Sequence, residues 1–258
     1  MKLPIIGILS GVALATLAIS SAAQAAILLP SLTPGSQYRL VFVTSGTRNA
    51  TSTNIADYNQ FVNNAAQAST NLNTALTTAG LTPSAINWTA IASTQRVNAR
   101  VNTATRPLPT DPSVPIYRVD GFAVASGVNV NADLWDGALT FPINVDEGGN
   151  QISERGNSVW TGTDDQGLTS NPLGSSTYVR VGDAFVSNSN WVSWGVGGPS
   201  GCAFCIVTPG PSSERRLYGI SSIVTVPTAT ATPEPSSLLS FITLGGLILG
   251  GAVRGVRK

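Results

Sequence analysis

The stretch that decides the fold is residues 38–44, YRLVFVT. It is rich in β-branched and aromatic side chains, and the turn-forming pairs Pro34-Gly35 and Ser45-Gly46 bound it on its two sides. Such a composition between turn signals is typical of a β-strand. The sequence therefore predicts that the domain opens with a strand against which the following segments pack.

Two amphipathic helices are predicted after this strand. Asn54 can cap the first helix, with Asp57 as its third residue, and Gly80 and Pro83 are expected to stop the second. The apolar positions on one face of the first helix are Ile55, Tyr58, Phe61, Val62, Ala65 and Ala66. Those of the second are Leu72, Ala75, Leu76 and Ala79. A helix with one apolar face packs against a sheet, which predicts a strand-helix unit at the front of the domain.

Short strands and loops are predicted for the rest of the domain. From Trp88 onward, short apolar stretches alternate with clusters of Gly, Pro, Asn and Asp. The expected strands are residues 88–92, 116–119, 122–125, 159–161 and 217–226. Residues 148–157 and 164–176 have little apolar content and are expected to be surface loops that carry function. The whole order predicts a single α+β domain over residues 26–226, with a loop-rich β half.

Residues 1–25 are predicted to be a signal peptide. Lys2 supplies a positive start, residues 5–19 carry no charge, and Ala23 and Ala25 are small enough for the pocket of a signal peptidase. The alternative is an uncleaved anchor, which needs about 20 apolar residues and is weakened by the Gly, Ser and Thr content here. Cleavage is expected after Ala25.

The other end of the chain is predicted to hold a membrane helix. Residues 227–236 are a Pro- and Thr-rich linker, residues 237–253 are almost wholly apolar, and residues 254–258 form a basic tail. The basic side chains, expected on the cytoplasmic side, are Arg254, Arg257 and Lys258. The apolar stretch is about 24 Å long as a helix, short for a hydrocarbon core of about 30 Å. A buried core helix is the alternative, but the unbroken apolarity and the terminal position argue against it.

This tail resembles the PEP-CTERM sorting signal of bacteria that carry exosortases. The resemblance is carried by Pro233, Glu234 and Pro235, followed by the apolar segment and then the basic tail. It implies that an exosortase-type membrane protease is a partner and cuts at the Pro-Glu-Pro motif. It also implies a precursor anchored in the inner membrane, a mature product at the cell surface or outside the cell, and an association with extracellular polysaccharide and biofilm matrix.

The central region resembles an uncharacterised family of bacterial outer-surface domains with a C-type-lectin-like fold. The matching segments are residues 42–45, the helix from Ile55, residues 88–94, 115–121 and 159–163, Trp191 and residues 215–220. The resemblance implies that the last strand pairs with the first and that residues 160–162 fill the core. Gly219 stands where the family usually shows a cysteine, so the customary disulfide to the last strand is missing.

The composition excludes several classes of function. Histidine is absent, so there is no Ser-His-Asp relay and no His-ligated zinc, and no cofactor is expected. The formal net charge is +1 and charged residues make up 10% of the chain, so no basic surface points to nucleic acid as a partner.

Trp135 and Trp194 are the candidate ligand-binding residues. A tryptophan face can stack on the apolar face of a sugar while neighbouring Asn and Asp residues bond its hydroxyls. Core filling is the alternative for any tryptophan, and Trp88 and Trp160 are expected to be buried because they lie in strand-like contexts. The sequence therefore predicts a weak saccharide site around Trp135 and Trp194.

Loop carboxylates are the weak candidates for calcium. They are Asp133, Asp136, Asp164 and Asp165, with Asp146 and Glu147 as further oxygen ligands. No EF-hand spacing occurs among them, so turn-forming Asx residues are the favoured interpretation and no metal is predicted. The same acids, as Asp164 with Asp165 or Asp133 with Asp136, are the carboxylate pairs that could be nominated for a glycosidase. We expect no catalytic residue and no enzyme activity.

The only cysteines, Cys202 and Cys205, are predicted to form a local disulfide outside the cytoplasm. Gly201 before them and residues 208–211 after them argue against the helix that a redox centre needs. The predicted function is that of an exported, non-catalytic surface or matrix protein that binds or structures extracellular polysaccharide. The alternatives are a carboxylate-dependent carbohydrate-active enzyme and a structural matrix protein with no ligand.

Overall fold

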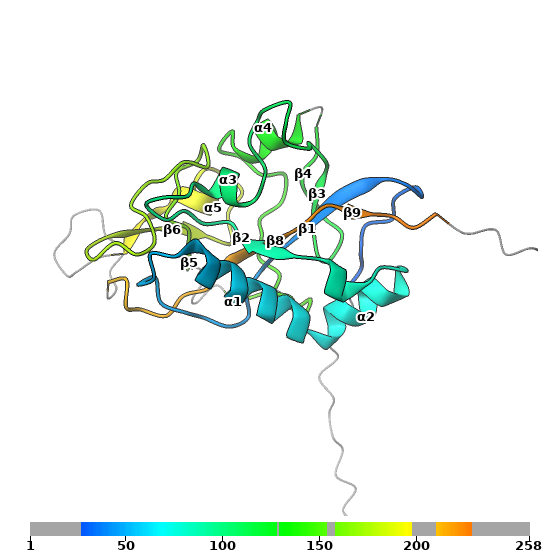
Figure 1. Cartoon of the computed structure of the whole chain (residues 1–258), viewed down its shortest axis with the longest axis horizontal. Coiled ribbons are helices and arrows are strands. Elements are labelled where there is room, and N and C mark those ends of the chain that lie inside the picture. The colour runs from blue at the N-terminus through cyan, green and yellow to red at the C-terminus, as the bar shows by residue number, and fades with distance from the viewer. Residues whose placement is uncertain (1–26, 128, 154–157, 198–209, 229–258) are drawn as a thin grey trace, which may run out of the picture.

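The stretch quoted first forms the centre of the larger of two sheets (Figure 1). The computed structural model describes residues 27–127, 129–153, 158–197 and 210–228. Within it, β1 (Gln37–Val43) pairs in parallel with β3 (Ile116–Arg118) and antiparallel with β8 (Tyr218–Ser221). The other strands are β2 (Trp88–Ala90), β4 (Ala123–Ala125) and β9 (Val224–Thr225). The order is β2-β8-β1-β3-β4, with β9 paired to the start of β1, so the last strands pair with the first.

Both predicted helices are confirmed. They are α1 (Ile55–Ala68) and α2 (Thr70–Thr78), followed by the 3₁₀ turn η1 (Pro83–Ala85). The Asn54 side chain accepts a hydrogen bond from the Ala56 N–H, as expected of a helix cap. Ser69 ends α1 and caps α2 by accepting from the Leu72 N–H, so a single residue separates the two helices. Tyr58 and Val62 are buried on the face of α1 that packs on the main sheet.

A second, three-stranded antiparallel sheet lies in the loop-rich half. Its strands are β5 (Ser158–Trp160), β6 (Val179–Asp183) and β7 (Gly195–Gly197). Three short helices belong to the same half: α3 (Ala99–Asn102), α4 (Val130–Leu134) and α5 (Asn190–Ser193). Trp160 and Trp191 are fully buried there. The molecule is therefore an α+β fold in which one apolar sheet region is joined to a half built mainly of loops.

Most predicted strands are confirmed, and the differences have local causes. The predicted strand 217–226 is two strands, β8 and β9, because the register with β1 shifts by one residue between them: Val41 pairs with Ile220, whereas Tyr38 pairs with Val224. Strands β6 and β7 and the three short helices were not predicted, since their segments show no apolar periodicity. Trp88 and Trp160 are buried as expected.

The structure gives a packing reason for Gly219. A Cβ atom placed on this residue would lie 2.5 Å from Val62 Cγ1 and 2.8 Å from Phe42 Cζ. Both neighbours are fully buried side chains, one from α1 and one from β1. The helix and the ring therefore occupy the space that a larger residue in β8 would need.

Both ends of the chain and the cysteine loop lie outside the described residues. This applies to the predicted residues Ala23, Ala25, Cys202, Cys205, Pro233, Glu234, Pro235, Arg254, Arg257 and Lys258. Among the residues that the structure does describe, no helix is long and apolar enough to cross a membrane. The predicted signal peptide, membrane helix and disulfide stay predictions.

Candidate functional site

Three of the predicted site residues meet at one hollow in the loop-rich half. This hollow, the loop pocket, has a volume of about 290 Å³. It is lined by Arg100, Pro107, Ala132, Trp135, Asp136, Asp165 and Gln166. The lining residues come from α3, from α4 and the turn after it, and from the loop that follows β5. The fold thus brings Trp135, Asp136 and Asp165 together although they are far apart in the sequence.

Trp135 is a wall of the loop pocket and offers no open stacking face. Its side chain is 6% exposed, and its indole N–H donates to the carbonyl and the hydroxyl oxygen of Thr105, both at 3.0 Å. Gly167 lies against the ring, because a Cβ on that glycine would be 2.7 Å from Trp135 Cδ2. Trp191 packs nearby with its ring centroid 5.8 Å away. The interpretation of Trp135 as an exposed sugar-stacking residue was wrong, since glycine and aromatic neighbours cover it.

The loop pocket is lined by charges of both signs. Asp136 is exposed, and its Oδ1 accepts from the Ala138 N–H at 2.9 Å. Asp165 lies beside the same turn, since a Cβ on Gly137 would be 3.7 Å from Asp165 Oδ2. Arg100 brings a guanidinium, and its backbone N–H bonds the Gly167 carbonyl at 3.3 Å, which ties α3 to the loop that holds Asp165. The pocket therefore presents acceptors and donors to the same small volume.

Asp133 and Asp164 both accept backbone hydrogen bonds and do not line the loop pocket. Asp133 Oδ2 accepts from the Ser126 N–H at 3.0 Å. Asp164 Oδ1 accepts from the backbone N–H groups of Gln166 and Leu168 at 3.0 and 2.8 Å, the pattern of an Asx turn. The favoured interpretation as a turn former is confirmed for Asp164. Asp133 lies within α4 instead, and its acceptor bond reaches back seven residues. Within the described part of the chain, no three His, Cys, Asp or Glu side chains are placed to hold a metal ion.

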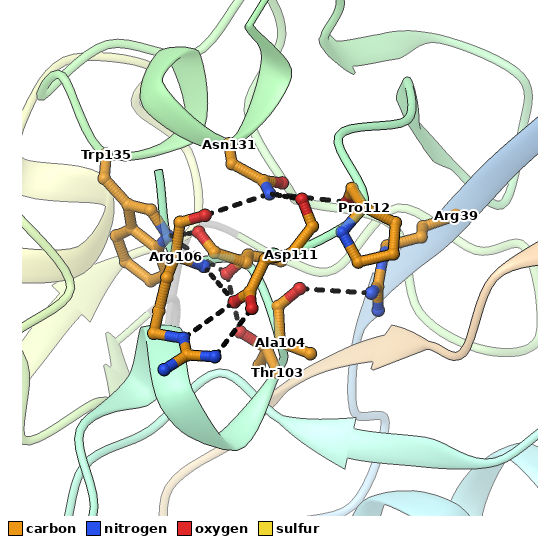
Figure 2. A network of polar contacts seen from close by, with 9 residues as sticks. Arg39, Thr103, Ala104, Arg106, Asp111, Pro112, Asn131 and Trp135 are labelled. Carbon is orange, nitrogen blue, oxygen red and sulfur yellow. Dashed lines mark hydrogen bonds and ion pairs between the residues drawn. The ribbon is translucent and has the colours of Figure 1, made fainter. Parts of the chain in front are cut away.

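A partly buried polar network lies next to Trp135 of the pocket (Figure 2). The Arg106 guanidinium grips Asp111 through Nε to Oδ2 at 2.9 Å and Nη2 to Oδ1 at 2.7 Å, and the hydrogen bonds from Arg106 lower the pKa of Asp111. The Asn131 amide donates to the carbonyls of Arg106, Asp111 and Pro112. Because Asn131 belongs to α4, the network fixes that helix, and Trp135 directly after it, to the 106–112 segment.

Trp194 is placed differently from Trp135. Its side chain is 42% exposed, and its backbone N–H bonds the Val181 carbonyl at 2.9 Å, which anchors it to β6. It does not line the loop pocket. Its exposure agrees with the role predicted for it, and binding by Trp194 stays a prediction.

An exposed aromatic pair was missed in the sequence. Phe122 and Phe141 are 47% and 41% exposed, and their ring centroids are 5.1 Å apart. The Arg118 guanidinium lies 5.0 Å from the Phe122 centroid and forms an ion pair with Asp120. A signal was present, since Phe122 follows Asp120-Gly121 and Phe141 precedes a proline, and an aromatic residue beside turn formers is placed near the surface.

Comparison with known proteins assigns nothing to this site. No protein-family model matches the chain, and no curated protein matches its sequence. The function therefore has to be inferred from the residues of the loop pocket and from the two ends of the chain.

Proposed function

We propose that the chain is an exported, non-catalytic surface or matrix protein that binds extracellular polysaccharide through a C-type-lectin-like domain. Its precursor is directed by residues 1–25 to the export machinery and held by residues 237–253 in the inner membrane. An exosortase-type protease releases the domain at Pro233-Glu234-Pro235, so that it reaches the cell surface or the matrix. The pairing of β8 and β9 with β1 supports the lectin-like comparison, in which the last strand pairs with the first.

The observation that carries the proposal is the mixed lining of the loop pocket. Asp136 and Asp165 can accept hydrogen bonds from hydroxyl groups, while Arg100 and the Gln166 amide can donate to them. A sugar hydroxyl both donates and accepts, so a pocket with both kinds of partner suits a polyhydroxylated chain. Its small volume of about 290 Å³ suits one sugar unit of a longer polymer held at the surface.

The pocket favours binding over hydrolysis. A glycosidase needs two carboxylates that flank a bond in a site from which water is largely excluded. Of the four acids nominated in the sequence, Asp133 and Asp164 accept backbone hydrogen bonds outside the pocket, and Asp136 is exposed to solvent. The remaining acid, Asp165, has no second carboxylate held in a dry site with it among the described residues lining this pocket.

The test is binding to the extracellular polysaccharide of the producing cells, measured by affinity electrophoresis and calorimetry. Asp136→Asn combined with Asp165→Asn is expected to weaken binding by about tenfold or more, because it removes charged acceptors for sugar hydroxyls. The matched control is Asp133→Asn with Asp164→Asn, which makes the same chemical change outside the pocket and leaves a side-chain oxygen to accept the backbone hydrogen bonds at each position. It is expected to bind like the native chain.

Three outcomes would contradict the proposal. Equal binding by both double variants would show that the loop pocket is not the polysaccharide-binding site. Release of reducing ends by the native chain, lost on Asp136→Asn and Asp165→Asn, would favour a carbohydrate-active enzyme. No binding by the native chain, together with matrix loss on deletion, would favour a structural protein without a ligand.

A further inference from the structure

A second and larger hollow lies on another side of the molecule. This hollow, the helix cleft, has a volume of about 550 Å³ and runs between α1 and the turn at residues 146–150. It shares no lining residue with the loop pocket. In Figure 1, α3 and α4 lie above the strands of the main sheet and α1 lies below them. The helices that contribute lining residues to the two hollows therefore lie on different sides of the sheet.

The polar wall of the helix cleft is held in place by its own hydrogen bonds. Glu147 is 6% exposed, and its carboxylate accepts from the Ser45 N–H at 2.8 Å and from the Ser45 hydroxyl. Its carbonyl accepts from the Ser69 hydroxyl at 2.6 Å, and the Asn71 amide donates to the Gly148 carbonyl at 2.9 Å. The turn is thus tied both to the end of β1 and to the junction of α1 and α2. The wall needs no rearrangement to receive a ligand.

The floor of the cleft combines an aromatic ring with small residues. Phe61 is partly buried on α1, and Ala65 and Ala68 follow it along the same helix. Gly46 faces the ring, since a Cβ on it would lie 3.6 Å from Phe61 Cζ. These small side chains leave the hollow open beside the ring, while the exposed Asn64 supplies an amide at its edge.

This combination is suited to a sugar ring. The apolar face of a pyranose can lie against Phe61 while its hydroxyls bond the exposed amides of Asn64 and Asn150 at the edge of the cleft. We propose that the helix cleft is a second saccharide-binding site, so that one copy of the protein holds two polysaccharide strands and cross-links them. The class of ligand rests on the function proposed above, but the site itself is built from different residues.

Two sites on different sides have a consequence that one site lacks. A monovalent protein coats a polymer, whereas a bivalent one joins chains, and the second contact forms at a raised effective concentration. The native chain is therefore expected to bind two short oligosaccharides prepared from the producer's polysaccharide and to increase the particle size of the intact polymer.

The variant that tests the cleft is Asn64→Arg. Asn64 is exposed, and arginine is a good helix former, so the long side chain can cover the cleft without breaking α1. The matched control is Gln60→Arg, which places the same charge at an exposed position of α1 outside the cleft lining. Oligosaccharide stoichiometry is measured by calorimetry, and polymer cross-linking by light scattering.

We expect Asn64→Arg to lower the stoichiometry from two to one and to abolish the growth of polymer particles, while Gln60→Arg behaves like the native chain. The loop-pocket double variant should also bind one oligosaccharide, and the combined variant none. If Asn64→Arg keeps native stoichiometry and cross-linking, the helix cleft is not a site, and the loop-pocket proposal is unaffected. If the loop-pocket variant keeps native stoichiometry and cross-linking while Asn64→Arg loses them, the function proposed for the loop pocket fails. The helix cleft is then still supported as a saccharide-binding site.

Discussion

The main sheet with α1 and the loop-rich half are stabilised in different ways. In the sheet region, Leu40 and Phe42 of β1 are fully buried in an apolar cluster with Val62 of α1. In the loop-rich half, polar side chains hold the backbone, as Asn131 does by donating to three carbonyls. Burial of apolar area is not directional, whereas a hydrogen bond fixes the direction of a particular atom. Both regions bury apolar side chains, Trp191 among them in the loop-rich half, but there the hydrogen bonds also fix the geometry of a site.

The largest effect that would test this comparison is expected in the sheet region, at Gly219. A methyl group there would lie 2.5 Å from Val62 Cγ1 and 2.8 Å from Phe42 Cζ, and both of these side chains are fully buried. Gly219→Ala is expected to lower the free energy of unfolding by about 1–3 kcal/mol, the usual cost of overpacking. Urea unfolding measures it.

The matched control is Gly210→Ala, because a Cβ on Gly210 would have no atom within 4 Å. Its unfolding free energy is expected to stay within about 0.5 kcal/mol of the native value. Equal unfolding midpoints for the two variants would show that the packing of α1 on β8 yields easily. The sheet region would then be no more tightly specified than the loops.

A smaller and pH-dependent effect is expected in the loop-rich half, at Asp111. Hydrogen bonds from Arg106 lower the pKa of Asp111 in the folded chain, so this carboxylate stabilises the fold above its unfolded pKa of about 3.9. That contribution is lost as the pH falls through the lower folded value. The loss is expected to be smaller than at Gly219, because the Arg106 side chain is 41% exposed and water screens the pair.

Asp111→Asn should therefore unfold more easily than the native chain at pH 7 and show a shallower loss of stability between pH 5 and the folded pKa. Thermal unfolding at a series of pH values measures both. Adding Arg106→Gln to Asp111→Asn is the control, and it should change little because the partner is already gone. A native acid profile in Asp111→Asn would mean that the network in Figure 2 does not hold the loop-rich half together.

The sequence predicted the fold well where the local composition and the spacing of apolar residues are typical of one kind of secondary structure. The β-branched and aromatic composition of β1 between turn signals and the one-sided apolar pattern of α1 were sufficient to predict both elements, and the caps at Asn54 and Gly80 placed the helix limits closely. Strand β6 was missed because Val179 and Val181 are separated by an arginine and followed by glycine, a pattern too short to distinguish from a loop.

The candidate site was only partly predictable, because its geometry depends on turns. Asp136 and Asp165 were nominated as loop acids, but nothing in their spacing shows that they share a pocket. Trp135 was assigned the wrong environment because its cover is Gly167, a residue with φ +75° that contributes no apolar side chain to a sequence pattern. Phe61 of the helix cleft was predicted only as a core position of α1. A periodic apolar pattern does not distinguish a partly exposed ring from a fully buried one.

The smallest expected effect concerns the end of α3, where the loop-rich half departs from ideal backbone geometry. The N–H groups of Ala104 and Thr105 bond the carbonyls of Val101 and Arg100 at 3.2 and 3.0 Å, the Schellman pattern that favours glycine at its left-handed position. Ala104 occupies that position with φ +51°. Ala104→Gly is expected to stabilise the fold by up to about 1 kcal/mol in urea unfolding, whereas Ala75→Gly inside α2 should destabilise it by about 1 kcal/mol. If both variants change the free energy of unfolding in the same direction, the strain assigned to Ala104 is contradicted. The hydrogen bonds at the end of α3 would then not be holding the backbone in an unfavourable conformation.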